Sequence, residues 1–237
     1  MKRLLILVFL ASCFQIQAQS SSELLKHFKA YYKQMRAQGD VQGIINGLTH
    51  LNILEPSEAR KDTLAYIYMS EGQNIQALNT IGIDSSPTDS DIAVQVKAVC
   101  LKAVNQPEKA LVHFQEMFKR KPNPMVAYEL AELNMQLQKY SEASKHVEYG
   151  LANVKDDMTK AFYETQNPYE VPLKAAFLYL KGLIKFNENK VTNIDDAVDI
   201  LDEALKLAPN FNMAQLGKNA LLQQKQQAAQ AAKQPKN

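Results

Sequence analysis

The chain has 237 residues, 46% of them hydrophobic and 22% charged, which excludes a wholly disordered protein. Its two cysteines exclude a scaffold built on disulfides. The formal net charge is +2. Removing a leader that carries Lys2 and Arg3 leaves a neutral chain, without the positive charge that non-specific nucleic-acid binding needs, so we expect no nucleic-acid partner.

Residues 1–18 have the layout of a secretory signal peptide, with a basic start, an apolar run over 4–14 and a small residue, Ala18, at the cut. The run is too short to cross a hydrocarbon core of ~30 Å, so we expect no transmembrane span after processing. Cleavage after Ala18 predicts a periplasmic protein. Alternatively, residues 10–13 resemble a bacterial lipobox, which would make Cys13 the lipidated first residue of an outer-membrane lipoprotein.

A small or compact residue recurs at a spacing of 33 along most of the remaining chain, and a large apolar residue follows it four positions later. The first members of these pairs are Ile44, Ala77, Ala110, Ala143 and, after a longer interval, Ala197. Proline stands twelve positions after the first member in three copies, at Pro56, Pro122 and Pro209. Each copy predicts two amphipathic helices joined by a short turn, whose apolar sides are buried by neighbouring copies. The predicted hairpins cover residues 22–56, 58–88, 89–123, 124–155 and 172–209.

Two segments fall outside this repeat. For the insertion at 156–171 we expect a short helix beginning near Asp156, followed by a loop marked by Pro168 and Pro172. A final capping helix is expected from residue 211, and the tail at 223–237, rich in Gln, Ala and Lys, is expected to be frayed or disordered.

The residues that repeat resemble the tetratricopeptide repeat (TPR) family over about residues 25–210. The match is best where Ala98, Ala110, Phe114 and Pro122 stand in step with the family pattern. This resemblance implies an all-α fold, a right-handed α-solenoid of about five TPR-like helical hairpins with a C-terminal capping helix. The sequence departs from the pattern in having no Trp, in a period one residue short, and in placing Lys97 and Lys181 where the family has Leu. Another α-solenoid of helical hairpins is the alternative.

No catalytic or metal-binding motif stands out. Phosphate loops, G-x-S-x-G and H-E-x-x-H are absent from the sequence. His113 and His146 occupy equivalent positions, and we expect exposed helical surface there rather than a metal site. The acidic cluster between Asp195 and Glu203 is interpreted as a solvated helix, and Cys100 as a buried small hydrophobic residue. We expect no enzyme activity, no cofactor and no metal.

In TPR proteins the first helix of each hairpin lines a concave surface that commonly receives a peptide or a partner helix. The resemblance therefore implies a protein or peptide partner. The corresponding residues here are Lys26, Lys29, Lys33, Arg36, Tyr66, Met69, Val99, Lys102, Tyr128, Glu132, Met135, Tyr179 and Phe186. Their cationic end and their aromatic and Met side chains suit a segment that carries acidic residues. The basic stripe at 26–36 also fits a solvated face that keeps the first hairpin soluble.

The leading hypothesis is an exported, non-enzymatic scaffold or adaptor of a bacterial cell envelope, which binds its partner through the concave surface. Three alternatives stay open: an outer-membrane lipoprotein that assists envelope protein assembly, an enzyme without recognisable motifs, and a passive subunit of a larger complex.

Overall fold

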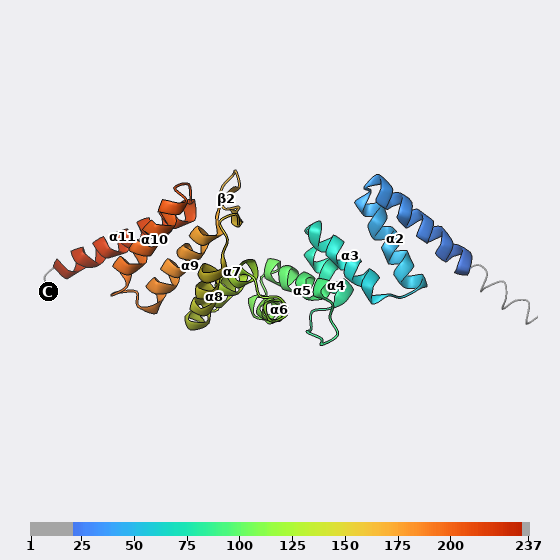
Figure 1. Ribbon diagram of the computed structural model, residues 1–237, viewed down its shortest axis with the longest axis horizontal. Helices are drawn as coiled ribbons and strands as arrows, with labels where there is room; N and C mark the ends of the chain where they lie inside the picture. The colour runs from blue at the N-terminus through green and yellow to red at the C-terminus, as the bar shows by residue number, and fades with distance from the viewer. Residues whose placement is uncertain (1–20, 234–237) are drawn as a thin grey trace, which may run out of the picture. The chain divides into compact units, whose positions relative to one another are not determined.

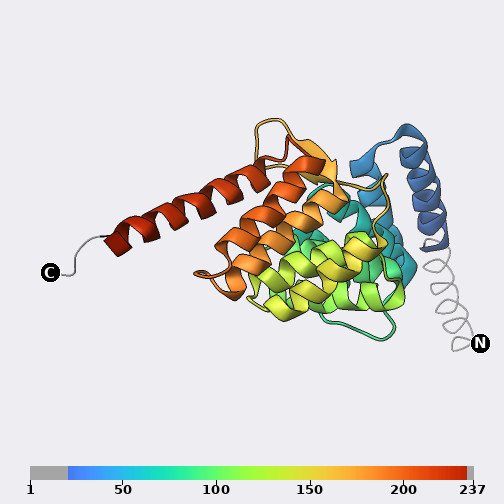
Figure 2. The same ribbon diagram turned by 60° about the vertical axis from the view of Figure 1, so that its left-hand side comes forward.

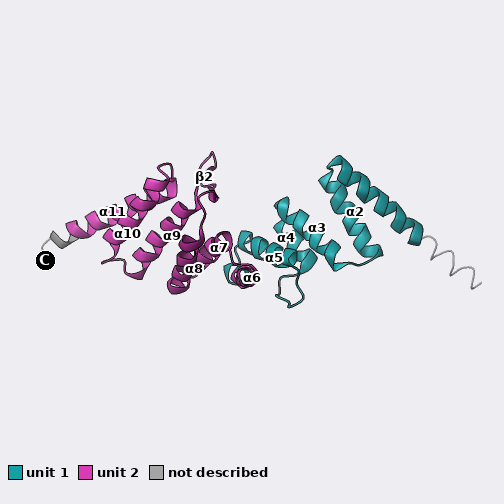
Figure 3. Cartoon of the chain, viewed as in Figure 1, with its two compact units in different colours: residues 1–110 teal, residues 111–237 magenta. Residues whose placement is uncertain are grey.

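The computed structural model describes residues 21–233, with side chains through residue 230. The chain divides into two units, which meet in sequence between Ala110 and Leu111 (Figure 3). Unit 1 contains a helix over residues 21–38, followed by α2 (Val41–Leu54), α3 (Glu58–Ser70), α4 (Asn74–Ile81) and α5 (Asp91–Ala103). Helix α6 (Pro107–Arg120) begins in unit 1 and ends in unit 2.

Unit 2 contains α7 (Pro124–Gln136), α8 (Tyr140–Asn153), the strands β1 (Thr159–Phe162) and β2 (Tyr169–Pro172), and then α9 (Leu173–Glu188), α10 (Ile194–Leu207) and α11 (Asn212–Lys233) (Figure 1). Successive helices of this unit pack against one another, and in Figure 2 they lie side by side from α7 in yellow-green to α10 in orange. The predicted all-α architecture of successive helical hairpins is confirmed.

The first helices of three hairpins begin at equivalent polar residues, spaced by 33. Ser57, Ser90 and Asn123 each accept a hydrogen bond through the side-chain oxygen from the backbone N–H three residues further on. Such caps satisfy one of the free N–H groups at a helix start and stabilise it by about 1 kcal/mol. The sequence thus sets the starts of α3, α5 and α7 in register.

The turns inside four hairpins use one backbone conformation, also at a spacing of 33. Gly39, Gly72, Asn105 and Gln138 have φ angles of 70°, 71°, 57° and 57°, in the left-handed region. At each turn the next residue donates its N–H to the carbonyl five residues earlier, as from Lys139 to the Asn134 carbonyl at 2.8 Å. This arrangement closes the end of the first helix and sends the chain into the second.

The repeated alanines lie in the buried core. Ala77, Ala110, Ala143 and Ala197 are all completely buried. The large residues four positions later are buried at Phe114, Val147 and Leu201 and half-buried at Ile81. Cys100 is also buried, as predicted, and burial raises the pKa of its thiol to about 11.

The prediction of a short helix near Asp156 is wrong. The inserted residues form an antiparallel β-hairpin, in which β1 pairs with β2 from Thr159 opposite Pro172 to Phe162 opposite Tyr169. The paired segments contain Thr159, Phe162, Tyr169 and Val171, which are residue types that favour strands. Val171 is buried on the side of the hairpin that packs against the helices, whereas Glu170 on the opposite side is exposed.

The tail prediction also needs correction, because α11 continues as a helix to Lys233. Its Gln, Ala and Lys residues are good helix formers. Lys225 pairs with Asp195 of α10 at 2.5 Å, and Gln224 donates to the Lys190 carbonyl at 3.2 Å. These contacts hold the middle of α11 against the preceding hairpin.

Within residues 21–233, no helix combines the length and apolar character required to cross a membrane. The predicted signal peptide over 1–18, including Cys13, lies outside the described residues, as do residues 234–237 at the end of the tail.

Candidate protein-interaction surface

The candidate surface of unit 1 is formed by the positions on its first helices that the sequence predicts for partner contact. The four predicted cations of the helix over 21–38 are all exposed: Lys26, Lys29, Lys33 and Arg36. Tyr66 of α3 is 44% exposed and Val99 of α5 is 37% exposed, while Met69 and Lys102 are half-buried. The predicted positions of unit 1 therefore reach solvent, wholly or in part.

Two of these cations belong to a pocket of about 320 Å³, lined by Tyr32, Lys33, Arg36 and Ala37. The Arg36 guanidinium lies 5.8 Å from the centre of the Tyr32 ring, an arrangement that holds a cation over an aromatic face. The pocket offers two positive charges and part of one ring, which suits an anionic group on a ligand.

Lys29 is engaged in an ion pair and contributes less than the sequence suggested. Its ammonium lies 3.3 Å from the Glu55 carboxylate, and that carboxylate also accepts a hydrogen bond from Arg60. Arg60 and then Lys29 hold the pKa of Glu55 below its ordinary value. Lys29 therefore stabilises the junction between α2 and α3, and the pocket cations Lys33 and Arg36 are the better candidates for partner contact.

Sequence reasoning missed one apolar member of this surface, Ile92, which is 43% exposed on α5. It lies seven residues before Val99, two helical turns along the same face. The repeat spacing could have found it, because Ile92 follows the predicted position Lys26 by 66 residues, which is two periods of 33. We call Lys33, Arg36, Tyr66, Ile92 and Val99 the unit 1 interaction face.

The corresponding positions of unit 2 are more enclosed. Tyr128 is 1% exposed and Tyr179 is 9% exposed, so the prediction that they contact a partner is corrected: both belong to the core. Glu132, Met135 and Phe186 are half-buried.

The β-hairpin and the capping helix explain this burial. The Lys160 ammonium of β1 lies 4.9 Å from the centre of the Tyr128 ring and pairs with Glu129 of α7 at 2.7 Å. The Tyr179 ring packs against Phe211, just before α11, with 5.2 Å between ring centres. Both rings are therefore covered by segments that the repeat pattern did not include.

Burial changes the chemistry of both hydroxyls. It raises the pKa of Tyr128 well above its ordinary value, with further contributions from Glu132, Glu129 and Tyr179. It also raises the pKa of Tyr179 to about 12, helped by the negative charges of Glu132 and Glu164. Both side chains stay neutral at physiological pH and act as packing residues.

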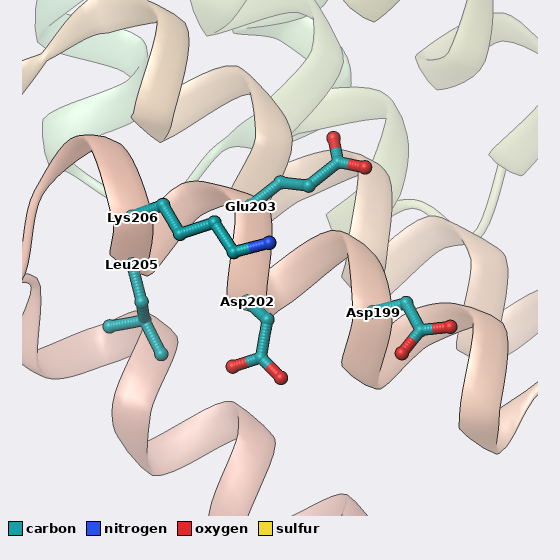
Figure 4. Close-up of a pocket in the computed structure, with 5 residues that line it drawn as sticks. All are labelled: Asp199, Asp202, Glu203, Leu205 and Lys206. Carbon is teal, nitrogen blue, oxygen red and sulfur yellow. The ribbon is translucent and has the colours of Figure 1, made fainter.

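A second pocket, of about 440 Å³, lies on α10 and is lined by Asp199, Asp202, Glu203, Leu205 and Lys206 (Figure 4). Its carboxylates do not converge, because Asp202 and Glu203 point away from one another in Figure 4. Lys218 of α11 also pairs with Asp202 at 2.5 Å. The pocket thus lacks the convergent oxygen atoms that a cation requires.

The two equivalent histidines are not the exposed surface that we predicted. His113 is 2% exposed, and His146 is half-buried, with its ring packed edge-on against Phe118. Burial lowers the pKa of His146. Over the part of the chain with described side chains, no three His, Cys, Asp or Glu residues are grouped so that they could hold a metal ion.

Solved structures with the same arrangement of hairpins are tetratricopeptide repeat proteins. YrrB, described as a TPR protein with an unusual peptide-binding site, aligns with a TM-score of 0.64 at 12% identity, over 87% of this chain and 97% of YrrB. A TPR protein from Parabacteroides merdae ATCC 43184 aligns with a TM-score of 0.61 at 18% identity, over 90% of this chain and 77% of that protein. The chain has the tetratricopeptide repeat fold.

The MamA protein aligns with a TM-score of 0.58 at 15% identity, over 78% of this chain and 92% of MamA. No protein-family model matches the chain, and no curated protein matches it significantly in sequence. At these identities the likeness shows the TPR fold alone, and both the role and the partner must be argued from the surface residues.

Proposed function

We propose that this TPR-fold protein is a non-enzymatic scaffold that binds a segment of a protein or peptide partner on the unit 1 interaction face. The observation that carries the proposal is the exposure of three large apolar side chains, Tyr66, Ile92 and Val99, on helices α3 and α5, which pack against each other. Clustered apolar side chains on a surface of this kind mark interaction sites. YrrB, a TPR protein with an unusual peptide-binding site, supports a similar use of the fold here.

The chemistry of the face defines the partner segment. Lys33 and Arg36 border the pocket in the first helix of unit 1, and the apolar side chains follow on α3 and α5. A segment with apolar anchors and at least one carboxylate complements both parts. A stacked repeat surface is already ordered before binding, which reduces the entropy lost on association.

Capture of partners from a cell-envelope extract tests the proposal. We expect the double variant Lys33→Glu/Arg36→Glu to reduce capture at least tenfold, and Tyr66→Ser/Val99→Ser to do the same. The matched controls are Lys181→Glu/Lys190→Glu, which reverses two exposed charges in unit 2, and Ile53→Ser/Ile75→Ser, which removes two exposed apolar residues from second helices. If the face variants and the controls capture equal amounts, the proposed face is wrong.

We further propose that the protein acts in the cell envelope, on the support of the residues at 1–18 alone. Intact mass of the mature protein separates the two processing routes. A chain that begins at Gln19 supports soluble release, and fatty-acid labelling that is lost in Cys13→Ser supports the lipoprotein. A chain in the cytosol that retains Met1 contradicts both.

A further inference from the structure

The β-hairpin of unit 2 has one strand edge that the protein leaves open. Leu173 donates its N–H to the Met158 carbonyl at 2.8 Å, which fixes the hydrogen-bond register immediately beside the paired strands. Because bonded and non-bonded pairs alternate in an antiparallel ladder, Lys160 pairs with Val171 and Phe162 with Tyr169 through backbone hydrogen bonds. The N–H and C=O groups of Thr159 and Ala161 therefore point away from β2.

Within the described part of the chain, these outward groups have no hydrogen-bond partner. Among residues 21–233, no hydrogen bond joins the backbone of Thr159 or Ala161 to any segment other than β2. Thr159 is exposed and Ala161 is half-exposed, and Figure 1 shows the hairpin extending beyond the helix ends beside α9. An unpaired strand edge of this kind is a template for another strand.

The opposite edge of the hairpin is protected. Pro172 occupies an outward position of β2 and has no N–H to donate, and the other outward residue is the charged Glu170. Proteins commonly use proline and charge to prevent pairing at a strand edge. On β1 the outward residues are the uncharged Thr159 and Ala161, so only this edge is available.

We infer that the outer edge of β1 docks an extended segment of a protein partner, which adds as an antiparallel third strand. The inference rests on the proposed scaffold function and names a second mode of contact within it. Backbone hydrogen bonds to Thr159 and Ala161 hold the segment, as in other cases of strand addition.

Charge selects the occupant of the edge. Glu170 lies opposite Ala161 on the solvent side of the hairpin and accepts a hydrogen bond from the Thr159 hydroxyl at 2.9 Å. Strands are spaced by about 4.8 Å, and the Ala161 side chain is small, so a Lys or Arg opposite Ala161 reaches the Glu170 carboxylate. A second copy of β1 could add to this edge in the antiparallel direction, with Thr159 of each copy opposite Ala161 of the other. That pairing would place Lys160 opposite Lys160, and like charges directly opposite each other destabilise a strand pair.

Hydrogen exchange measured by NMR on the full chain tests the open edge. In the free protein the amides of Thr159 and Ala161 exchange fast, while those of Lys160 and Phe162 are protected by β2. The probe is the capped peptide Lys-Val-Thr-Val-Lys-Val-Thr-Val, which presents Lys and Thr on one face. We expect it to slow exchange of the Thr159 and Ala161 amides at least tenfold, and a version with Glu in place of Lys to bind at least fivefold more weakly.

Backbone methylation of the peptide tests the direction of pairing without altering the protein. In an antiparallel strand, the residues opposite Thr159 and Ala161 turn their N–H groups toward β1, and they are the Lys and Thr residues. N-methylation of that set abolishes protection, and N-methylation of the valines leaves it unchanged. Equal effects of the two methylated peptides, or no protection at millimolar peptide, overturn the inference.

Two variants complete the test. Ala161→Pro removes one outward N–H, and we expect the peptide no longer to protect the Thr159 amide in this variant. Ala161→Val keeps that N–H, and we expect the peptide to protect the Thr159 amide as in the natural protein. Protected amides at Lys160 and Phe162 show that the hairpin of each variant is folded. If the free protein instead protects Thr159 and Ala161 in proportion to its own concentration, a second copy occupies the edge and the inference is wrong.

The inference and the proposed function fail separately. The peptide assay reads only amides of β1, and capture through the unit 1 interaction face is read with Lys33→Glu/Arg36→Glu. If the edge of β1 binds no peptide, partner capture through the unit 1 interaction face is unaffected. If Lys33→Glu/Arg36→Glu captures as much partner as the natural protein, the protection of the β1 amides by the peptide is still valid.

Discussion

Gly150 of α8 lies directly against the ring of Phe177 in α9, and a methyl group at position 150 would overlap that ring. Phe177 is completely buried and also packs edge-to-face on Tyr128, with 5.5 Å between ring centres. The absence of a side chain at Gly150 thus allows an aromatic residue to fill the space between two hairpins.

We predict that Gly150→Ala destabilises the protein by about 3 kcal/mol, since overpacking a core costs about 1–3 kcal/mol and Phe177 has no free space into which to move. Urea unfolding followed by circular dichroism measures the change. Gly217→Ala in α11 is the control: its new methyl group would meet Leu201 at an ordinary 3.6 Å, and we expect unchanged or slightly higher stability. Equal losses in the two variants would contradict the close contact with Phe177.

A second prediction concerns the left-handed turns. Gln138 has a φ of 57°, a conformation that costs a residue with a side chain about 1–2 kcal/mol and glycine almost nothing. Gln138→Gly is therefore expected to stabilise the protein by about 0.5–1 kcal/mol, after allowance for the greater freedom of the unfolded chain. Gln136→Gly, two residues earlier and still inside α7, should instead lose about 1 kcal/mol. Thermal and urea unfolding of both variants check the opposite signs.

A third prediction concerns Lys97, which stands where the TPR pattern has Leu. Its side chain is 3% exposed, and its ammonium pairs with Asp89 and donates to the Asp84 carbonyl, both at 2.7 Å. Lys97→Met leaves the Asp89 charge without this partner, and loss of one member of a buried pair costs about 3–5 kcal/mol. Adding Asp89→Asn to Lys97→Met should recover part of the stability. A double variant no more stable than the single one would show that lost packing, rather than charge, accounts for the effect.

A fourth prediction concerns pH. Burial lowers the pKa of His146 below its ordinary 6.5, and Lys145 adds to that effect while Glu142 opposes it. The unfolded chain therefore binds this proton more readily than the folded protein. The contribution of neutral His146 is fully present above pH 6.5 and is lost as pH falls through the lower folded-state pKa. The stability difference between the natural protein and His146→Gln, measured by urea unfolding from pH 8 to pH 5, should shrink below pH 6.5. A difference independent of pH would contradict the shifted pKa.

The repeat could be predicted because its spacing reflects helix geometry. The interval of 33 placed Ala77, Ala110 and Ala143 in equivalent, completely buried sites, and the same interval relates the caps and the turns. Residues inside one hairpin or between neighbouring hairpins are close in sequence, so a local pattern carries most of the information.

The candidate surface was harder to predict, because exposure depends on what covers each position. Gln95 and Tyr128 stand at equivalent places on their first helices, 33 residues apart, yet Gln95 is exposed and Tyr128 is only 1% exposed. The difference comes from the β-hairpin with Lys160 and from α9 with Phe177. Asp156 follows Asn123 by 33 residues and was expected to begin a helix, but residues 159–162 pair with residues 169–172 as strands, a pairing that the helical repeat pattern does not include. The partner contacts themselves stay predictions.

The order of contacts along unit 2 has a consequence for synthesis on the ribosome. Each helix from α7 to α10 meets its neighbour as soon as that neighbour has emerged, so these helices can assemble while the chain is still growing. One contact of the hairpin must wait, because the Tyr169 hydroxyl accepts a hydrogen bond from the Met213 N–H at 3.4 Å, at the start of α11. This contact between β2 and α11 thus forms only when the last helix has been made.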